Sequence, residues 1–400
     1  MPRRFNFKPF ADILTAVIFL AIIYVLAAAF IITPDNAKSE DENRVLQQLP
    51  ALNADSLFSG RFTKQMGDYY ADQFPARNAF VGAKTAFSYF VMRQPENKGA
   101  FVARDGYIMQ RFDIYDDTPN NFDADFTYGE TMANLEANLG YISAFASDMA
   151  SLGVSVTFAA PPRKIDVMTN ELPPFFPTGR DDDYLERIRA ALSPEIYLPL
   201  EDVLRPKSGE YIYYKTDHHW TTLGAYYAYA ALGERLGYAP LPADSFTVKQ
   251  ASASFFGTTW SKMGAKWVAP DSIYYYTTPG EDGEYVTEIT GGKTLAGFYD
   301  TAALETKDKY SSFIGGINAL TLIHAADGSP KEKLLLVTDS FGQSLAPFLA
   351  RHFDLHIMDP RFYSGSVYSY VKDNDIKKVL ILQGVESLST MDAPKRLSLR

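Results

Sequence analysis

The 400-residue chain is predicted to fold as an α/β protein with a mostly parallel sheet and helices on both faces, preceded by one membrane-spanning helix. Two observations predict this class. In the C-terminal third, apolar runs typical of buried strands alternate with helical patterns, and this alternation is typical of βαβ units. Near the N-terminus, one apolar run is long enough to cross a bilayer.

The first expected element is a transmembrane helix over residues 13–32. A helix needs about 20 apolar residues to cross a hydrocarbon core, and this run supplies them. Arg3, Arg4 and Lys8 precede the run and acidic residues follow it, so the positive-inside rule places the N-terminus in the cytoplasm and the rest of the chain outside. The alternative is a cleaved signal peptide, with Ala27-Ala28-Ala29 as the cleavage site. The apolar run is longer than that of a usual signal peptide, which favours a single-pass anchor in the cell membrane.

Three parts are expected along the chain. Residues 1–33 are a cytoplasmic stub and the anchor, and residues 34–104 are a juxtamembrane linker with a docking segment. Residues 105–400 are the main domain. Within it, residues 240–316 are rich in Gly, Tyr, Thr and Asp, and we expect an antiparallel insertion or long loops beside the site.

The main domain is expected to begin with a helix over residues 130–152, where apolar residues recur at helical spacing. Gly153 ends this helix, and a strand over residues 154–160 follows. The C-terminal third repeats the alternation as strand 333–337, helix 343–353, strand 355–358, helix 366–372 and strand 378–383. Parallel sheets of this kind bind ligands at the carboxyl ends of their strands, and Ser340 falls at such a position.

Composition excludes several classes of function. The formal charge of −10 argues against a nucleic-acid partner, because binding to phosphates depends on clustered Lys and Arg. The chain contains no cysteine, which excludes disulfides, thiolate metal sites and a cysteine nucleophile.

Residues 214–222 place an aspartate two positions before a histidine. In an extended segment Asp217 and His219 would share one face, so the carboxylate could accept the Nδ1 proton and leave Nε2 free to take another. The same alternation would turn His218 to the opposite face. A metal site formed by Asp217, His218 and His219 is the rival interpretation. It is disfavoured because adjacent histidines diverge in a strand and because the chain has no HExxH spacing.

Ser340 is the candidate nucleophile. It lies in Asp339-Ser340-Phe341-Gly342, at an expected strand-to-helix turn, where backbone N–H groups can stabilise an oxyanion. A serine after a strand is common by accident, and the sequence lacks the G-x-S-x-G elbow of a standard α/β-hydrolase. Together with Asp217 and His219, Ser340 completes the set of groups that acyl transfer through a hydroxyl requires.

These residues resemble a known family. The segment Thr216-Asp217-His218-His219-Trp220 resembles the motif that names the DHHW protein family. Its D-x-H-W is similar to that of the alginate O-acetyltransferase accessory proteins, in which the D-x-H pair also precedes the serine. Thr338-Asp339-Ser340-Phe341 resembles their serine block, and the likeness extends to the anchor and to residues 72–77, 161–164 and 385–388. The resemblance implies an SGNH-hydrolase-like three-layer α/β/α sandwich.

The resemblance also implies a function: a membrane-anchored, extracytoplasmic O-acetyltransferase that modifies hydroxyls of an exported polysaccharide during exopolysaccharide biosynthesis. Ser340 would carry the acetyl group, His219 would act as base and then acid, and Asp217 would orient His219. No cofactor and no metal are implied. The expected partners are the polysaccharide substrate, the membrane and a membrane-bound O-acyltransferase that delivers the acetyl group.

Two alternatives stay open. A carbohydrate acetylesterase would use the same three residues with water as the acceptor, and a catalytically silent glycan-binding component of an export complex would not use them. The Gly and Asn blocks that complete the oxyanion hole of SGNH enzymes have no clear counterpart here. Gly315-Gly316-Ile317-Asn318 and Gln383 are the candidates for this role.

Overall fold

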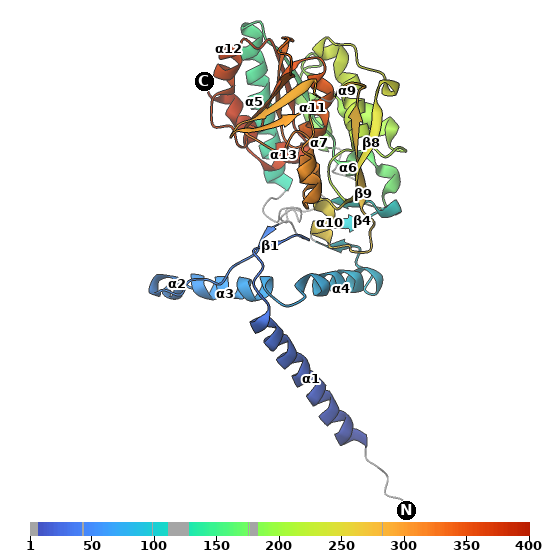
Figure 1. The fold of residues 1–400 in the computed structure, drawn as a ribbon, viewed down its shortest axis with the longest axis vertical. Helices are drawn as coiled ribbons and strands as arrows, with labels where there is room; N and C mark the ends of the chain where they lie inside the picture. The colour runs from blue at the N-terminus through green and yellow to red at the C-terminus, as the bar shows by residue number, and fades with distance from the viewer. Residues whose placement is uncertain are drawn as a thin grey trace, which may run out of the picture. The chain divides into compact units, whose positions relative to one another are not determined.

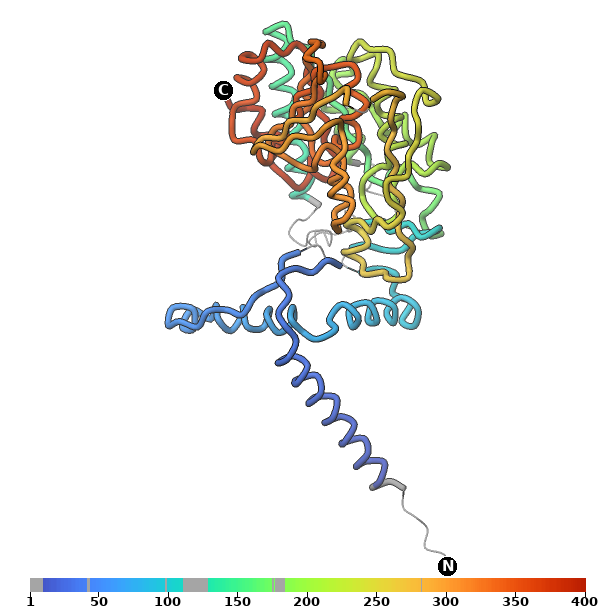
Figure 2. The backbone as a smooth tube through the Cα atoms, in the orientation of Figure 1, coloured from blue at the N-terminus to red at the C-terminus, as the bar shows by residue number. Residues whose placement is uncertain are grey.

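The computed structural model describes residues 7–41, 44–97, 99–110, 128–174, 176, 183–281 and 283–400. Two compact units are present, Met1–Met92 and Arg93–Arg400. Figures 1 and 2 show the course of the chain in the same orientation.

The first unit consists of helices and one short strand pair. Its elements are α1 (Phe7–Ile32), β1 (Lys38–Ser39), β2 (Arg44–Val45), α2 (Ala54–Phe58), α3 (Arg61–Asp72) and α4 (Arg77–Phe90). Within α1, the segment Phe10–Ile32 is long and apolar enough to cross a membrane, and its most apolar stretch is not buried. A signal sequence would have the same properties.

The second unit is built on an eight-stranded sheet in the order β11-β10-β12-β14-β13-β15-β6-β7. The strands are β6 (Ser155–Ala159), β7 (Tyr197–Leu198), β10 (Tyr285–Ile289), β11 (Lys293–Ala296), β12 (Leu320–Ala325), β13 (Lys333–Thr338), β14 (Asp354–Met358) and β15 (Lys378–Leu382). The five strands from β14 to β7 are parallel, whereas β11, β10 and β12 add to β14 in antiparallel pairs. The sheet is therefore mixed, and the prediction of a mostly parallel sheet is not confirmed. The βαβ pattern predicts the parallel half alone, because the other half comes from hairpins and long connections.

Helices cover both faces of this sheet. Successive side chains of a strand point to opposite faces, and in β13 Leu334 and Leu336 join one buried core while Leu335 and Val337 join the other. The first core includes α6 (Lys164–Val167), α8 (Leu200–Leu204), α9 (Thr222–Leu236) and α11 (Gly342–Ala350). The second includes α5 (Tyr128–Ser151), α7 (Asp183–Ala191), α12 (Val367–Asp373) and α13 (Val385–Thr390). The result is the α/β layering visible in Figure 1.

The elements expected from the sequence correspond closely to observed ones. The helix predicted over residues 130–152 is α5, and the strand after it is β6. The five predicted elements of the C-terminal third are β13, α11, β14, α12 and β15. Residues 240–316 hold an antiparallel pair formed by β8 (Thr247–Phe255) and β9 (Asp271–Thr277), helix α10 (Thr258–Met263), and the main-sheet strands β10 and β11.

The remaining elements are short. A three-stranded sheet contains β3 (Glu96–Asn97), β4 (Ala100–Val102) and β5 (Ile108–Gln110). Among the described residues, 3-10 helices occur at Arg104–Gly106, Thr169–Glu171, Arg205–Lys207, Ala243–Ser245, Thr301–Glu305, Lys309–Ser312 and Ala393–Ser398.

The carboxyl ends of the parallel strands meet at one edge of the sheet. Thr338 at the end of β13 pairs with Leu382 at the end of β15, and Leu382 pairs with Ala159 at the end of β6. The segments that follow these three strands are therefore neighbours. Ser340 lies in one of them, which places it where open α/β sheets bind ligands.

Candidate active site

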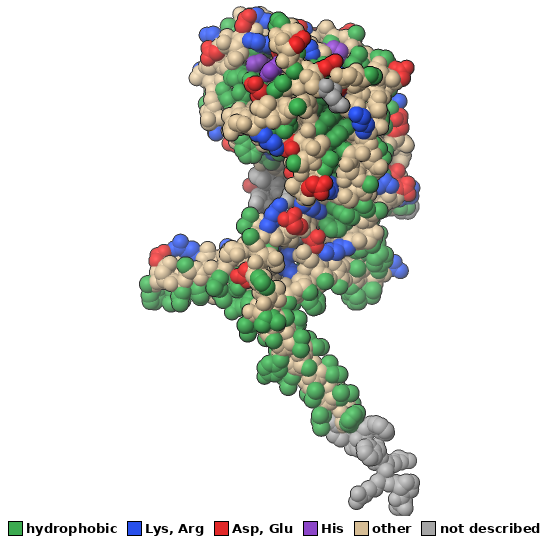
Figure 3. Space-filling model, in the orientation of Figure 1, with side chains coloured by type: hydrophobic (Ala, Val, Ile, Leu, Met, Phe, Trp, Pro, Cys, Tyr) green, Lys and Arg blue, Asp and Glu red, His purple; other side chains and the backbone are tan. Residues whose placement is uncertain are grey.

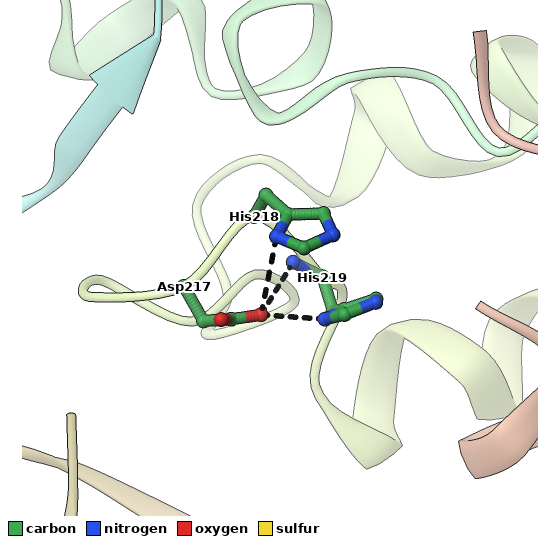
Figure 4. A group of neighbouring side chains, drawn as sticks. All are labelled: Asp217, His218 and His219. Atoms are coloured by element: carbon green, nitrogen blue, oxygen red, sulfur yellow. Dashed lines mark hydrogen bonds and ion pairs between the residues drawn. The ribbon is translucent and has the colours of Figure 1, made fainter. Parts of the chain in front are cut away.

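Asp217, His219 and Ser340 lie in one continuous row of hydrogen bonds. The Asp217 Oδ1 atom accepts a hydrogen bond from His219 Nδ1 at 2.6 Å, and the Ser340 hydroxyl lies 2.6 Å from His219 Nε2. Figure 4 shows the carboxylate of Asp217 beside the His219 ring. The structure thus brings the three predicted residues together. One ring nitrogen of His219 faces the Ser340 hydroxyl, and the Asp217 carboxylate holds the other.

The Ser340 turn is fixed by the aspartate that precedes it. The buried carboxylate of Asp339 accepts hydrogen bonds from the backbone N–H of Phe341 at 3.0 Å and of Gly384 at 2.8 Å, and from the Ser387 hydroxyl at 2.7 Å. These bonds join the end of β13 to the start of α13. A Cβ atom at Gly342 would lie 2.4 Å from the Thr338 side chain, so glycine allows this tight strand-to-helix turn.

The loop that carries Asp217 is held by a buried lysine. The Nζ of Lys164 donates to the carbonyl oxygens of Tyr214 at 2.9 Å, Lys215 at 3.2 Å and Asp217 at 2.7 Å. All three ammonium protons therefore have acceptors. Burial lowers the pKa of Lys164 to about 8, although Asp271 and Asp217 act in the opposite direction.

Asp217 is a buried anion with several donors. Burial would by itself raise its pKa, but His219 and His218, together with hydrogen bonds from His219, hold the pKa of Asp217 well below its usual range. The other oxygen, Oδ2, accepts from the backbone N–H of Thr258 at 2.8 Å and from its hydroxyl at 3.0 Å. Gly257 directly precedes α10. A Cβ atom at this position would lie 2.2 Å from the Asp217 side chain, so the close approach of Asp217 to the start of α10 requires glycine.

The His219 ring is enclosed by aromatic side chains. Tyr310 stacks on it with ring centroids 4.2 Å apart, and Phe341 meets it edge-on at 4.9 Å. The Tyr310 hydroxyl lies 3.0 Å from Ser344 Oγ, which also accepts a hydrogen bond from Trp220 Nε1 at 2.9 Å. Through Ser344, the tryptophan that follows His219 is tied to the helix that follows Ser340.

No role for Lys164, Thr258 or Tyr310 is predicted from the sequence. Lys164 lies within residues 161–164, which carry part of the family resemblance, and Thr258 lies within the expected insertion, but nothing in their local patterns indicates which groups they reach. Tyr310 lies in a segment without periodicity, and its position against His219 depends on tertiary packing.

The predicted orientation of His218 is wrong. Its ring does not turn to the opposite face but lies 3.8 Å, centroid to centroid, from the His219 ring, and its Nδ1 is 3.8 Å from Asp217 Oδ1. Its Nδ1 also bonds the Thr258 hydroxyl at 2.6 Å. The reason is that residues 215–219 form successive bends rather than a strand, so the two-residue alternation does not apply.

This geometry bears on the rival metal interpretation. Because the histidines do not diverge, ligand atoms of Asp217, His218 and His219 all lie within 4.8 Å of one another. Both ring nitrogens of His219 are nevertheless hydrogen-bonded, to Asp217 and to Ser340, and His218 Nδ1 bonds Thr258. A metal ion at this cluster would compete with those hydrogen bonds, whereas the hydrogen-bonded row satisfies the same atoms without one.

A pocket adjoins the row. Its lining includes Gln110, Arg163, Lys164, His218, Thr259 and Phe341, so it shares His218 and Phe341 with the surroundings of His219. Thr259 is fully buried, and its hydroxyl has no partner within the described part of the chain. The pocket therefore offers both polar and apolar contacts beside the residues that pack on the His219 ring.

The two candidates for the oxyanion role differ in position. Asn318 directs its amide nitrogen to the carbonyl oxygens of Gly315 and Gly316, at 3.3 and 3.1 Å, within its own turn. Gln383 directly follows β15, the strand next to β13, and its buried Oε1 has no partner among the residues described. Gln383 therefore follows a strand of the sheet edge that carries Ser340, but its unpaired atom is an acceptor, whereas an oxyanion requires N–H donors.

Comparison with known proteins supports the resemblance noted in the sequence. Residues 195–358 match the family model for DHHW proteins. The matched DHHW segment holds Asp217, His219 and Ser340, and the predicted resemblance to this family is confirmed. No curated protein sequence matches the chain significantly.

Several solved structures have a similar fold. A DHHW family protein from Eubacterium siraeum is 22% identical, covers 75% of this chain and 95% of its own, and has a TM-score of 0.57. PatB1 from Bacillus cereus, in a structure with a sulfonyl adduct, is 21% identical over 73% of this chain and 98% of its own, with a TM-score of 0.56. The O-acetyltransferase domain of AlgJ from Pseudomonas putida is 16% identical over 74% of this chain and 93% of its own, with a TM-score of 0.47. The first two likenesses show that about three quarters of this chain shares its fold with known proteins.

Proposed function

We propose that this chain is a membrane-anchored, extracytoplasmic O-acetyltransferase of SGNH-hydrolase-like type that acts on hydroxyls of an exported polysaccharide. The observation that carries the proposal is the hydrogen-bonded row from Asp217 through His219 to Ser340. The resemblance to the DHHW family and to the alginate O-acetyltransferase accessory proteins supports acetyl transfer as the reaction and a glycan as the acceptor.

In the first half of the proposed reaction, Ser340 Oγ attacks the carbonyl carbon of an acetyl ester while His219 Nε2 takes the hydroxyl proton. The tetrahedral intermediate then collapses, the bond to the donor alcohol breaks, and His219 returns the proton to the leaving alcohol. Acetyl-Ser340 remains. Asp217 stays ionised and stabilises the imidazolium that forms in each step, in accord with its lowered pKa.

In the second half, a sugar hydroxyl takes the place of the donor alcohol. His219 Nε2 removes its proton, the sugar oxygen attacks the acetyl-Ser340 carbonyl, and Ser340 Oγ leaves and regains the proton. An extracytoplasmic enzyme has no access to cytosolic acetyl-CoA. The acetyl group must therefore come from an ester donor or from a membrane-bound O-acyltransferase partner, and either source gives a ping-pong scheme.

Transfer and hydrolysis can be separated by the fate of the acetyl group. Full-length protein in detergent is supplied with a chromogenic acetyl ester, with and without an oligosaccharide acceptor, and both acetate and acetylated sugar are quantified. We expect slow acetate release without acceptor and acetylated sugar with it, both abolished in Ser340→Ala. Fast acetate release with no acetylated sugar at high acceptor concentration would instead identify a carbohydrate acetylesterase. Absence of both products in the wild-type protein would favour a catalytically silent, glycan-binding component.

The metal alternative is tested in the same assay. Activity should be unchanged after dialysis against a chelator, because each step uses side-chain groups of the chain alone. Loss of activity on chelation, with recovery on adding a divalent ion, would reassign Asp217, His218 and His219 as metal ligands.

A further inference from the structure

We propose that helix α4, together with the C-terminal end of α3 and the residues that join the two helices, lies on the outer surface of the lipid bilayer and inserts an aromatic face into its interfacial region. This aromatic face consists of Tyr70, Phe74, Phe80, Phe87 and Phe90. The proposal rests on the membrane anchor assigned to α1 under the proposed function, but it does not depend on acetyl transfer.

The distribution of side chains on α4 is the reverse of that in a soluble protein. Phe80, Phe87 and Phe90 are 53%, 56% and 49% exposed, and their spacing places them on one side of the helix. The buried positions of α4 are Gly82 and Thr85, on the other side. A helix in water normally buries its large apolar side chains, so a helix that exposes them indicates an apolar environment outside the protein.

The aromatic face continues into α3 and reaches the end of α1. Phe74, between the two helices, packs edge-on against Phe80 with ring centroids 5.7 Å apart. In α3, Tyr70 packs against Phe30 of α1 at 5.4 Å, and the adjacent Tyr69 packs against the same ring at 5.8 Å. Figure 3 shows hydrophobic side chains gathered both along α1 and on the side of α2, α3 and α4 from which α1 extends.

The packing of Tyr69 and Tyr70 on Phe30 sets the depth of the aromatic face in the membrane. Phe30 is close to the C-terminal end of the 23-residue apolar segment Phe10–Ile32, which spans roughly 35 Å as a helix, slightly more than a hydrocarbon core. Side chains that pack on Phe30 therefore lie near the boundary between hydrocarbon and headgroups. Tyrosine is favoured at this level because its ring is apolar and its hydroxyl reaches water, and phenylalanine is typical of the buried face of an interfacial helix.

Polar contacts hold α3 against the segment that leaves the membrane. The Tyr69 hydroxyl donates to Asp35 at 3.0 Å, and Gln73 exchanges two hydrogen bonds with the backbone of Asn36, at 2.9 and 3.0 Å. These bonds keep α3 near the end of α1 rather than free on a linker. Lys84, which is exposed on α4 between Phe80 and Phe87, can extend its ammonium to lipid phosphates while its methylene chain covers apolar surface.

The absence of cysteine from the chain allows a direct test. Single-cysteine variants Phe87→Cys, Ala21→Cys and Lys249→Cys of the full-length protein are labelled with an environment-sensitive fluorophore and reconstituted in phosphatidylcholine–phosphatidylglycerol vesicles. Quenching by lipids that carry a spin label at carbon 5 or carbon 12 reports depth, and aqueous iodide reports exposure to water. Ala21 lies within α1 and serves as the embedded control, whereas Lys249 is exposed on β8 and serves as the aqueous control.

The label at position 87 should be quenched more strongly by the carbon-5 than by the carbon-12 spin label, as expected for a helix about 5–10 Å deep in the interface. The order should be reversed at position 21, and position 249 should respond to iodide alone. When Phe74 and Phe80 are both replaced by Ser, a label at position 90 should lose lipid quenching, whereas a label at position 21 should keep it.

Three outcomes would overturn the proposal. Iodide quenching at position 87 like that at position 249 would mean that the face is in water. Protection from both iodide and lipid quenchers would mean that protein covers it, either a second copy or another part of the chain. Loss of lipid quenching at both 21 and 87 would reject the anchor together with the surface, and the acetyl-transfer assays would stand independently of that result.

Discussion

The ring of Tyr310 lies flat against the imidazole of His219, with centroids 4.2 Å apart and the two planes inclined by only 10°. Asp217 and Ser340 hold the two nitrogens of the His219 ring, and the stack on Tyr310 restrains the tilt of the ring about the line through these two bonds. Burial raises the pKa of the Tyr310 hydroxyl, so the ring stays neutral beside the proposed base. Tyr310 is thus a positioning residue for the proposed base.

Replacing Tyr310 with Leu should lower kcat/KM by roughly two- to tenfold, because an aromatic contact is worth about 0.5–1.5 kcal/mol beyond the area that it buries. Tyr310→Phe keeps the stack and removes only the hydrogen bond to Ser344, so it should stay within about twofold of wild type by the same scale. Steady-state kinetics with matched thermal melts measure both effects. An equal loss of activity in the two variants would show that the hydroxyl matters rather than the stack.

Lys164 should impose an alkaline limit on activity. As the pH rises through its pKa of about 8, the ammonium loses a proton and keeps two N–H donors for three carbonyl acceptors. The loop that carries Asp217 then loses one of its supports. We expect kcat to fall with an apparent pKa near 8, after correction for spontaneous ester hydrolysis.

Lys164→Gln tests this assignment. The variant should be about tenfold less active at pH 7, in line with the loss of one charge-assisted buried hydrogen bond, and its activity should no longer fall above pH 8. The control is Lys215→Gln on the same loop. Its Nζ donates to the Asp105 carbonyl at 2.7 Å and lies over the Tyr107 ring, away from the three carbonyls that Lys164 binds, so this variant should retain the alkaline limit. Persistence of that limit in Lys164→Gln would assign it to another group.

Asp217 should contribute stability that disappears in acid. Its pKa in the folded protein is well below the unfolded value of about 3.9, so its ionised form favours folding. This contribution is complete above the unfolded pKa and is lost as the pH falls through the lower folded pKa. The difference in Tm between wild type and Asp217→Asn should therefore be largest near pH 7 and shrink toward pH 3. A difference that stays constant or grows in acid would contradict the assignment, and the exposed Asp244→Asn serves as the control.

Substitution of His218 should reduce activity much less than substitution of His219, although not because the two side chains point to opposite faces, as the sequence indicated. His219→Ala removes the proposed base and should lower kcat by roughly 10³-fold or more. His218→Ala removes a ring that packs on His219 and a hydrogen bond to Thr258, whose hydroxyl also bonds Asp217, so we expect a loss of about tenfold. Equal catalytic loss in both variants with unchanged melting would reject this order.

The sequence predicts the parallel half of the fold and the three residues of the row for identifiable reasons. Strands such as β13 and β15 are continuous apolar runs because both of their faces are buried, and helices such as α5 show their period directly. The order of Asp217, His219 and Ser340 along the chain, together with a strand end before the serine, is local information.

The remainder depends on contacts between distant segments. Strands β10 and β12 are separated by about 30 residues, and their antiparallel addition to β14 is not visible in local periodicity. The bend over residues 215–219 is imposed by Lys164 and Asp271 from elsewhere in the chain, and it reverses the direction predicted for His218. The stack of Tyr310 on His219 likewise joins residues that no sequence motif connects.

The proposed reaction requires that Ser340 carry the acetyl group. Full-length protein is mixed with an activated acetyl ester in the absence of acceptor, quenched in acid after a few seconds, digested and analysed by mass spectrometry. We expect a mass gain of one acetyl group on the peptide that contains Ser340. The gain should be absent in Ser340→Ala and should be lost when oligosaccharide is added before the quench. Acetylated sugar formed without any acetyl-Ser340 at any time, or formed undiminished by Ser340→Ala, would contradict it.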